Sequence, residues 1–137
     1  MASPVKGIHH INFIVRDIDA AERRYRELLG LGPALREELP GRGVVTARFQ
    51  MGDTWLVLVQ PTSDQGEPAR HLREHGEGFF LLSFATDDLE EAMPAVQSAG
   101  GSFTAPQPRH GLDNWRIIDI DPAQTFGALL QLADERG

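Results

Sequence analysis

The sequence of 137 residues contains no cysteine, and this absence excludes a disulfide framework, a thiolate metal site and a cysteine nucleophile. Basic residues are also scarce, since 13 Lys and Arg against 20 Asp and Glu give a formal net charge of −7. Binding of nucleic acid is therefore not expected, because contacts to phosphates need a basic surface. No apolar run has the length of a membrane span or the form of a signal peptide, so we expect a cytoplasmic protein with no membrane association.

An internal repeat is the most informative feature that is present. Residues 8–21 align with residues 79–92 without a gap, at an offset of 71, and Phe, Asp and Ala recur at matching places. A second pair of segments, 56–58 and 130–132, aligns at an offset of 74. Half a chain of this size would bury too little surface to be stable alone. The repeat therefore predicts one domain, residues 1–137, built from two modules that share a core.

The order of predicted elements is the same in both modules. Each begins with a strand rich in β-branched and aromatic residues, continues with a helix that starts at Asp17 or at Asp87 or Asp88, and ends with three strands. Module one covers 7–61 (strands 8–15, 34–38, 44–51 and 54–60, helix 17–29), a polar linker with a short helix at 68–75 covers 62–77, and module two covers 78–134 (strands 79–85, 102–104, 115–120 and 128–133, helix 88–99). The fold class is α+β, with paired βαβββ modules.

These segments together resemble the vicinal oxygen chelate superfamily, which includes glyoxalase, bleomycin-resistance proteins, extradiol dioxygenases and methylmalonyl-CoA epimerase. The resemblance rests on the order and spacing of the opening strand 8–15, the hairpin 52–54, the segment 75–78 before the fifth strand, and Asp121-Pro122 before the last strand. The epimerase is the closest in pattern. The resemblance implies that the two modules form a curled mixed sheet around a cavity.

The resemblance also implies a divalent metal held by four positions, which fall here on His10, Val57, Leu81 and Gln131. Two of these are hydrocarbons, and a catalytic metal needs about three protein ligands. His10 and Gln131 are thus weak candidates, and we expect no cofactor, with a divalent metal disfavoured.

The two glutamate bases that the epimerase uses fall here on Gly41 and Gln131. Neither glycine nor an amide accepts a proton from carbon at neutral pH, which disfavours the usual epimerase reaction. Glu37 and Glu38 lie nearby and become alternatives if the register slips.

Strand alternation predicts the lining of the cavity. If His10 points inward, Asn12 does too, whereas His9 and Phe13 face the helix. The predicted site then has His10 and Gln131 as the residues that act on the ligand; the residues that contact it are Asn12, Arg48, Trp55, Val57, Leu81, Ser83 and Trp115. Such a mostly apolar lining with a few polar groups is typical of small-molecule sites.

Several of these residues have a second interpretation. His10 and Gln131 are also compatible with hydrogen-bonded structural roles, and Trp55 and Trp115 with packing. Arg48 either faces inward, where it would hold a carboxylate or phosphate, or faces solvent, which is commoner for arginine.

Two further motifs are short. Residues 71–75 fit the His-x-x-Glu-His pattern of a metal-binding helix, but they already form the predicted linker helix. His110 lies in a loop segment that could close over the cavity.

Two functions follow as hypotheses, and both predict a homodimer that binds a small organic ligand. The first is a glyoxalase- or epimerase-like lyase or isomerase that acts on an acyl-CoA or a carbonyl compound through His10 at a degraded metal site. The second is a metal-free binding protein that sequesters drugs, as bleomycin-resistance proteins do.

Overall fold

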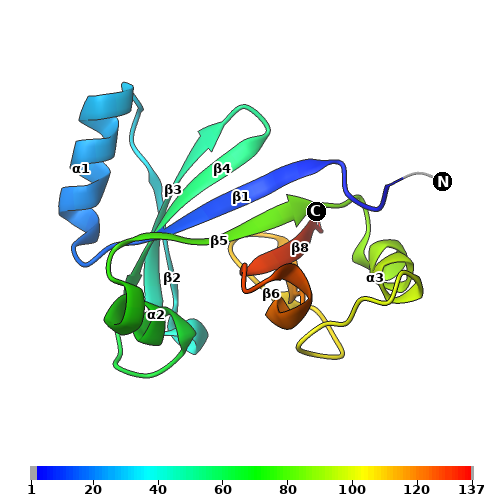
Figure 1. Cartoon of the computed structure of the whole chain (residues 1–137). Helices are drawn as coiled ribbons and strands as arrows, with labels where there is room; N and C mark the ends of the chain where they lie inside the picture. Colours follow the sequence, from blue (N-terminus) through cyan, green and yellow to red (C-terminus); the bar gives the residue numbers. More distant parts are fainter. Residues whose placement is uncertain (1–2, 137) are drawn as a thin grey trace. The chain divides into compact units, whose positions relative to one another are not determined.

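The computed structural model describes residues 3–136 and contains the βαβββ order twice (Figure 1). The first set is β1 (Gly7–Ile14), α1 (Ile18–Leu29), β2 (Leu35–Leu39), β3 (Val44–Met51) and β4 (Thr54–Pro61). After α2 (Glu67–His75), the second set is β5 (Gly78–Ala85), α3 (Leu89–Ser98), β6 (Arg109–His110), β7 (Trp115–Asp119) and β8 (Leu130–Glu135). Short 3-10 turns occupy Pro40–Arg42 and Pro122–Thr125.

The chain forms two compact units whose boundaries lie inside β1 and inside β5. The N-terminal unit contains Ile11–Phe80, with the strand order β2-β3-β4-β1. The C-terminal unit combines residues 3–10 with residues 81–136, and its strand order is β1-β5-β8-β7-β6. His10 therefore belongs structurally to the module that is farther along the chain.

Helix α1 begins and ends where capping chemistry predicts. The side chain of Asp17 accepts a hydrogen bond from the Ala20 amide at 3.1 Å, which satisfies one of the free donors of the first turn. The helix ends at Gly30, whose φ of 66° is a left-handed conformation that glycine adopts without steric cost. The predicted start and end of this helix are confirmed.

Alternation along β3 and β4 separates two faces of the sheet in the N-terminal unit. Helix α1 packs on β3 and β4, where Ala47, Phe49, Leu56 and Leu58 form a buried cluster with Ile18, and Phe13 packs against it. The residues between them, such as Arg48 and its register partner Val57, point to the opposite face. This confirms that Phe13 faces the helix, as alternation predicts.

The same division holds in the C-terminal unit. Leu132 and Ile118, which are register partners on β8 and β7, pack with Leu89 and Ala92 of α3. Their neighbours Gln131 and Asp119 are also register partners, and they lie on the face away from α3. The period of two thus directs Gln131 and Asp119 to the face of the sheet away from α3.

Two equivalent backbone bonds confirm the offsets of the repeat. The Val15 amide donates to the Val59 carbonyl at 2.9 Å, and the Thr86 amide donates to the Ala133 carbonyl at 2.8 Å. The donors lie 71 positions apart and the acceptors 74 apart, which are the offsets of the sequence alignment.

The strand predicted at 102–104 is reduced to an isolated bridge. Within that segment Phe103 makes a single bridge to Ile120, and the sixth strand lies later, at Arg109–His110. Pro106 and Pro108 stand between the two segments and lack backbone N–H donors, so a continuous ladder from residue 102 cannot form.

No helix within residues 3–136 has the length and apolar character needed to cross a membrane.

Candidate functional site

The predicted site residues divide between the two units. His10, Leu81, Ser83, Trp115 and Gln131 belong to the C-terminal unit, whereas Asn12, Arg48, Trp55 and Val57 belong to the N-terminal unit.

Two adjacent histidines on β1, in the C-terminal unit, are both buried, with exposures of 4% for His9 and 2% for His10. Their Nδ1 atoms lie 2.8 Å apart in a hydrogen bond, and His9 Nε2 lies 2.9 Å from Glu135 Oε2. The His10 ring stacks on Trp115 with a centroid distance of 4.8 Å, and the His9 ring meets the same indole edge-on. The expectation that His9 faces the helix is corrected, because its bonds join it to His10 and Glu135.

Burial keeps both imidazoles neutral. Loss of solvent lowers the pKa of His10 to about 3, neighbouring His9 lowers it further, and a hydrogen bond with the Gln131 side chain, which favours the charged ring, raises it. Burial also lowers the pKa of His9, against the influence of Glu135, which raises it. At neutral pH each ring therefore has one N–H donor and one lone-pair acceptor.

A row of polar side chains lies near His10. Ser83 on β5 and Asp119 on β7 are the register partners of Gln131 on β8, so the three lie side by side on one face. The Gln131 amide nitrogen donates to Asp119 Oδ1 at 2.9 Å, and the guanidinium of Arg109 pairs with the same carboxylate. We call His10, Ser83, Asp119 and Gln131 the polar row.

Two atoms of the polar row are buried without a hydrogen-bond partner among residues 3–136, namely Ser83 Oγ and Gln131 Oε1. Their residues are 0% and 3% exposed. An unsatisfied buried polar atom costs about 1–3 kcal/mol, so it requires an explanation such as a water or a ligand. The polar row therefore has the character of a binding site.

In the N-terminal unit, Arg48 is 7% exposed, which excludes the interpretation that it faces solvent. Its guanidinium donates to Glu37 at 2.7 Å and lies 5.2 Å from the centre of the Trp55 ring. Glu37 is thus engaged by Arg48. Trp55 forms a cation–π contact on the face opposite α1.

The positions implied as metal ligands do not match a metal site. Val57 is 1% exposed and Leu81 is 4% exposed, and neither side chain has a lone pair. Gln131 directs its amide nitrogen to Asp119, and His10 uses Nδ1 for His9. One imidazole nitrogen and one amide oxygen are fewer donors than the about three protein ligands of a catalytic metal.

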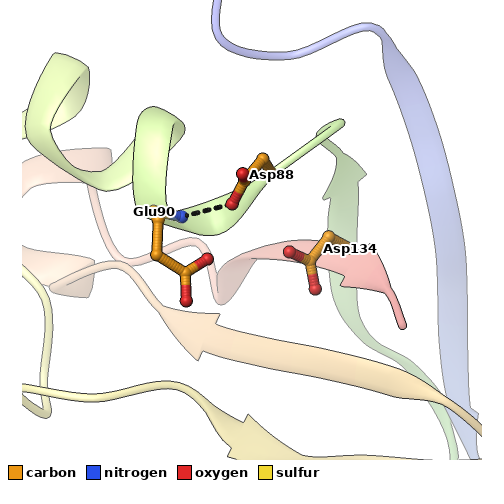
Figure 2. A group of neighbouring side chains, drawn as sticks. All are labelled: Asp88, Glu90 and Asp134. Atoms are coloured by element: carbon orange, nitrogen blue, oxygen red, sulfur yellow. Dashed lines mark hydrogen bonds between the residues drawn. The ribbon is translucent and has the colours of Figure 1, made fainter. Parts of the chain in front are cut away.

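Among the residues that the structure describes, one group has the spacing of a metal site: Asp88, Glu90 and Asp134, which we call the acidic cluster. Figure 2 shows Asp88 and Glu90 at the start of α3 and Asp134 on β8, with the Glu90 amide donating to Asp88. Sequence reasoning identified Asp88 only as a helix cap.

Arginines neutralise this acidic cluster. Arg116 lies 2.6 Å from both Asp134 and Glu90, and Arg136 lies 2.6 Å from Glu90 and 3.1 Å from Asp88. Arg116 lowers the pKa of Glu90 well below its usual range, and these carboxylates in turn raise the pKa of Arg116. The carboxylates are thus occupied by guanidinium groups, and the cluster is an ion-pair network that fixes α3 to β7 and β8.

The two short motifs do not extend the site. His71 and His75 on α2 approach with ring centroids 4.6 Å apart, but His71 also bonds the Phe79 carbonyl, and no third ligand joins them among residues 3–136. His110 lies on β6 rather than in a loop, and its side chain is exposed.

Sequence reasoning missed four residues that hold the site together: His9, Arg109, Asp119 and Glu135. The adjacent His9-His10 pair was visible in the sequence, but alternation assigned the two rings to opposite faces of the strand. The other three contribute through strand register, which the sequence alone does not reveal.

The comparisons with known proteins agree on a family. Residues 9–118 match the model of the Glyoxalase/Bleomycin resistance protein/Dioxygenase superfamily. The uncharacterized protein YqjC of Bacillus subtilis is 28% identical over 130 residues, which are 95% of this chain and 93% of that protein.

Solved structures share the fold over nearly all of the chain. Methylmalonyl-CoA epimerase from Mycobacterium tuberculosis has a TM-score of 0.94 at 25% identity, covering 100% of this chain and 93% of the other. A variant of Streptomyces coelicolor methylmalonyl-CoA epimerase in complex with 2-nitronate-propionyl-CoA has a TM-score of 0.89 at 25% identity, covering 97% and 99%. The predicted fold class is confirmed, and the chain belongs to the glyoxalase, bleomycin resistance protein and dioxygenase superfamily, which is the vicinal oxygen chelate superfamily.

Proposed function

We propose that this protein binds an acyl-CoA thioester, with the acyl group contacting the polar row. The observation that carries the proposal is the pair of buried atoms without partners, Ser83 Oγ and Gln131 Oε1, beside the neutral imidazole of His10. The similarity to an epimerase whose structure was solved in complex with 2-nitronate-propionyl-CoA supports the choice of ligand class. A contact from Leu81, and a homodimer, remain part of the same prediction.

Hydrogen bonding is the role that suits His10 best. A general base works well when its pKa lies near the working pH, and a pKa of about 3 makes this imidazole a weak base. A neutral ring still accepts a hydrogen bond through its lone pair. We therefore expect His10 to bind and orient the acyl group, and we expect slow or no exchange of the proton on the carbon next to the thioester.

We also expect no divalent cofactor. Leu81 and Val57 contribute no donor atoms, so purification without added metal should give a protein free of stoichiometric nickel, cobalt, zinc or manganese. Stoichiometric metal by elemental analysis would show that residues outside the implied positions complete a site.

A thermal-shift titration tests the proposed function. Propionyl-CoA at about 100 times its dissociation constant should add about 2.7 kcal/mol to the free energy of unfolding, which appears as a higher Tm. His10→Ala should lose this shift. His75→Ala removes an exposed imidazole from α2 and should keep it. Coenzyme A without an acyl group should give a smaller shift than the thioester.

Shifts with hydrophobic drugs but with no thioester would reject the acyl-CoA proposal and favour a drug-sequestering protein. An equal shift in wild type and His10→Ala would place the ligand away from the polar row.

A further inference from the structure

The polar row contains hydrogen-bond acceptors, and neighbouring charged groups determine which of its atoms accept. The carboxylate of Glu135 can only accept hydrogen bonds. Because it lies 2.9 Å from His9 Nε2, that nitrogen must carry the proton.

The proton on His9 determines the proton on His10. A neutral His9 that is protonated on Nε2 has a bare Nδ1, which accepts. The atom 2.8 Å away, His10 Nδ1, must therefore be the donor in that bond. Since His10 is also neutral, its lone pair is on Nε2.

A second series of hydrogen bonds fixes the orientation of the Gln131 amide by the same logic. The Asp119 carboxylate accepts from the Gln131 amide nitrogen at 2.9 Å and is itself held by Arg109. The nitrogen and the oxygen of an amide diverge from the same carbon, so with the nitrogen bonded to Asp119 the oxygen Oε1 is turned away from that carboxylate. That oxygen is the buried acceptor without a partner.

We propose that Glu135 and His9, and Arg109 and Asp119, are positioning residues that hold His10 Nε2 and Gln131 Oε1 as fixed acceptors, so that this site takes a hydrogen-bond donor on the ligand. A hydroxyl group next to the thioester has the right chemistry. A carboxylate at the same place has the wrong chemistry, because it would bring lone pairs against lone pairs in a desolvated site. The choice of ligand rests on the proposed function, whereas the acceptor assignment does not.

Ser83 does not disturb this assignment. Its hydroxyl both donates and accepts, so it adapts to either kind of ligand group. The selectivity therefore depends on His10 and Gln131.

The first test measures the His10 tautomer in the free protein by nitrogen-15 NMR of the imidazole rings. His10→Gln identifies the His10 resonances among the five histidines. We expect Nδ1 of His10 in the protonated region and Nε2 in the unprotonated region. Protonation on Nε2 in the wild type would overturn the proposal without any variant.

The second test reverses the order of hydrogen-bond donors and acceptors that runs from residue 135 through His9 to His10. Glu135→Lys replaces the acceptor next to His9 by a donor, which should move the proton of His9 to Nδ1 and that of His10 to Nε2. Glu135 is half exposed, with 52% of its side chain accessible, so the fold should accept lysine. Glu91→Lys makes the same charge change at an exposed position of α3 and should leave the tautomer unchanged. An unchanged tautomer in Glu135→Lys would show that Glu135 does not position His10.

The third test compares ligands that differ in one group, namely propionyl-CoA, 2-hydroxypropionyl-CoA and methylmalonyl-CoA. We expect the hydroxyl compound to bind about fivefold more tightly than propionyl-CoA, as one net hydrogen bond allows, and methylmalonyl-CoA to bind least tightly. Glu135→Lys should lose the preference for the hydroxyl. Tightest binding of methylmalonyl-CoA by the wild type would overturn the proposal. Failure of all three to bind would reject the proposed function instead, and the tautomer would then decide the acceptor assignment alone.

Discussion

The C-terminal unit contains two clusters of polar side chains, and they differ in how completely their atoms are paired. In the acidic cluster, Asp88, Glu90 and Asp134 face Arg116 and Arg136, and each carboxylate lies within 4.0 Å of a guanidinium. In the polar row, Ser83 and Gln131 each keep a buried atom without a partner. The pairing indicates that the acidic cluster stabilises the fold, whereas the polar row has hydrogen-bonding capacity left for a ligand.

The largest effect is expected from a variant that breaks the acidic cluster. Asp134 has 1% of its side chain exposed and accepts from the Leu89 amide as well as from Arg116. Asp134→Ala should lower the free energy of unfolding by about 3 kcal/mol, as breaking a buried ion pair does. Urea unfolding measures this change in the free energy of unfolding. Glu90→Gln changes an exposed member of the cluster and should shift the urea midpoint much less; equal shifts would contradict the assignment of Asp134 as the central residue.

The same cluster predicts the response to acid. Burial alone would raise the pKa of Asp134, but hydrogen bonds from Arg116 and the Leu89 amide outweigh burial and hold the pKa below its ordinary 3.8. A lowered folded-state pKa gives stability that is fully present above the unfolded-state value and is lost as the pH falls through the folded-state value. Stability should therefore decline below about pH 4. Asp134→Asn should show a weaker decline in unfolding experiments across this range, and an unchanged decline would assign the acid response to other carboxylates.

Removal of a polar group from the polar row should raise the free energy of unfolding, whereas removal of one from the acidic cluster lowers it. Ser83→Ala removes a buried hydroxyl whose oxygen has no partner, so the variant should be about 1 kcal/mol more stable than wild type. Its affinity for 2-hydroxypropionyl-CoA should fall. Thermal unfolding with and without ligand measures both. A destabilised Ser83→Ala that binds normally would mean that the hydroxyl serves the fold.

The smallest effect is expected from a variant that adds a carboxylate to the polar row and so makes it more like the acidic cluster. Gln131→Glu introduces a carboxylate next to His10, so affinity for a divalent metal should rise. The rise should be modest, because Leu81 and Val57 still contribute no donors and the new charge meets Asp119. Metal titration followed by calorimetry measures it. A large gain would mean that other side chains reach the metal.

Much of the fold could be predicted because it depends on local patterns. Asp17, Gly30 and the period-two alternation of β3 and β4 define elements within a few residues, and the repeat supplied the second module. Phe103 shows the limit. It has strand propensity, yet the prolines that follow prevent a ladder.

The candidate site was predicted only in part. His10, Ser83 and Gln131 follow from the repeat, the resemblance and alternation. Glu135 and Asp119 were missed, because their contacts to His9 and Gln131 depend on the pairing of strands far apart in the chain. Arg48 was left open between two faces, since alternation gives the period of a strand and not which face is buried.

The most direct test of the central claim is the nitrogen-15 resonance of His10 Nε2 during a titration with 2-hydroxypropionyl-CoA, with binding followed in parallel by calorimetry. If the polar row binds the acyl group through fixed acceptors, this resonance should move toward the protonated region in proportion to occupancy, while Nδ1 stays protonated. Saturation of binding with no change at His10 Nε2 would contradict the account.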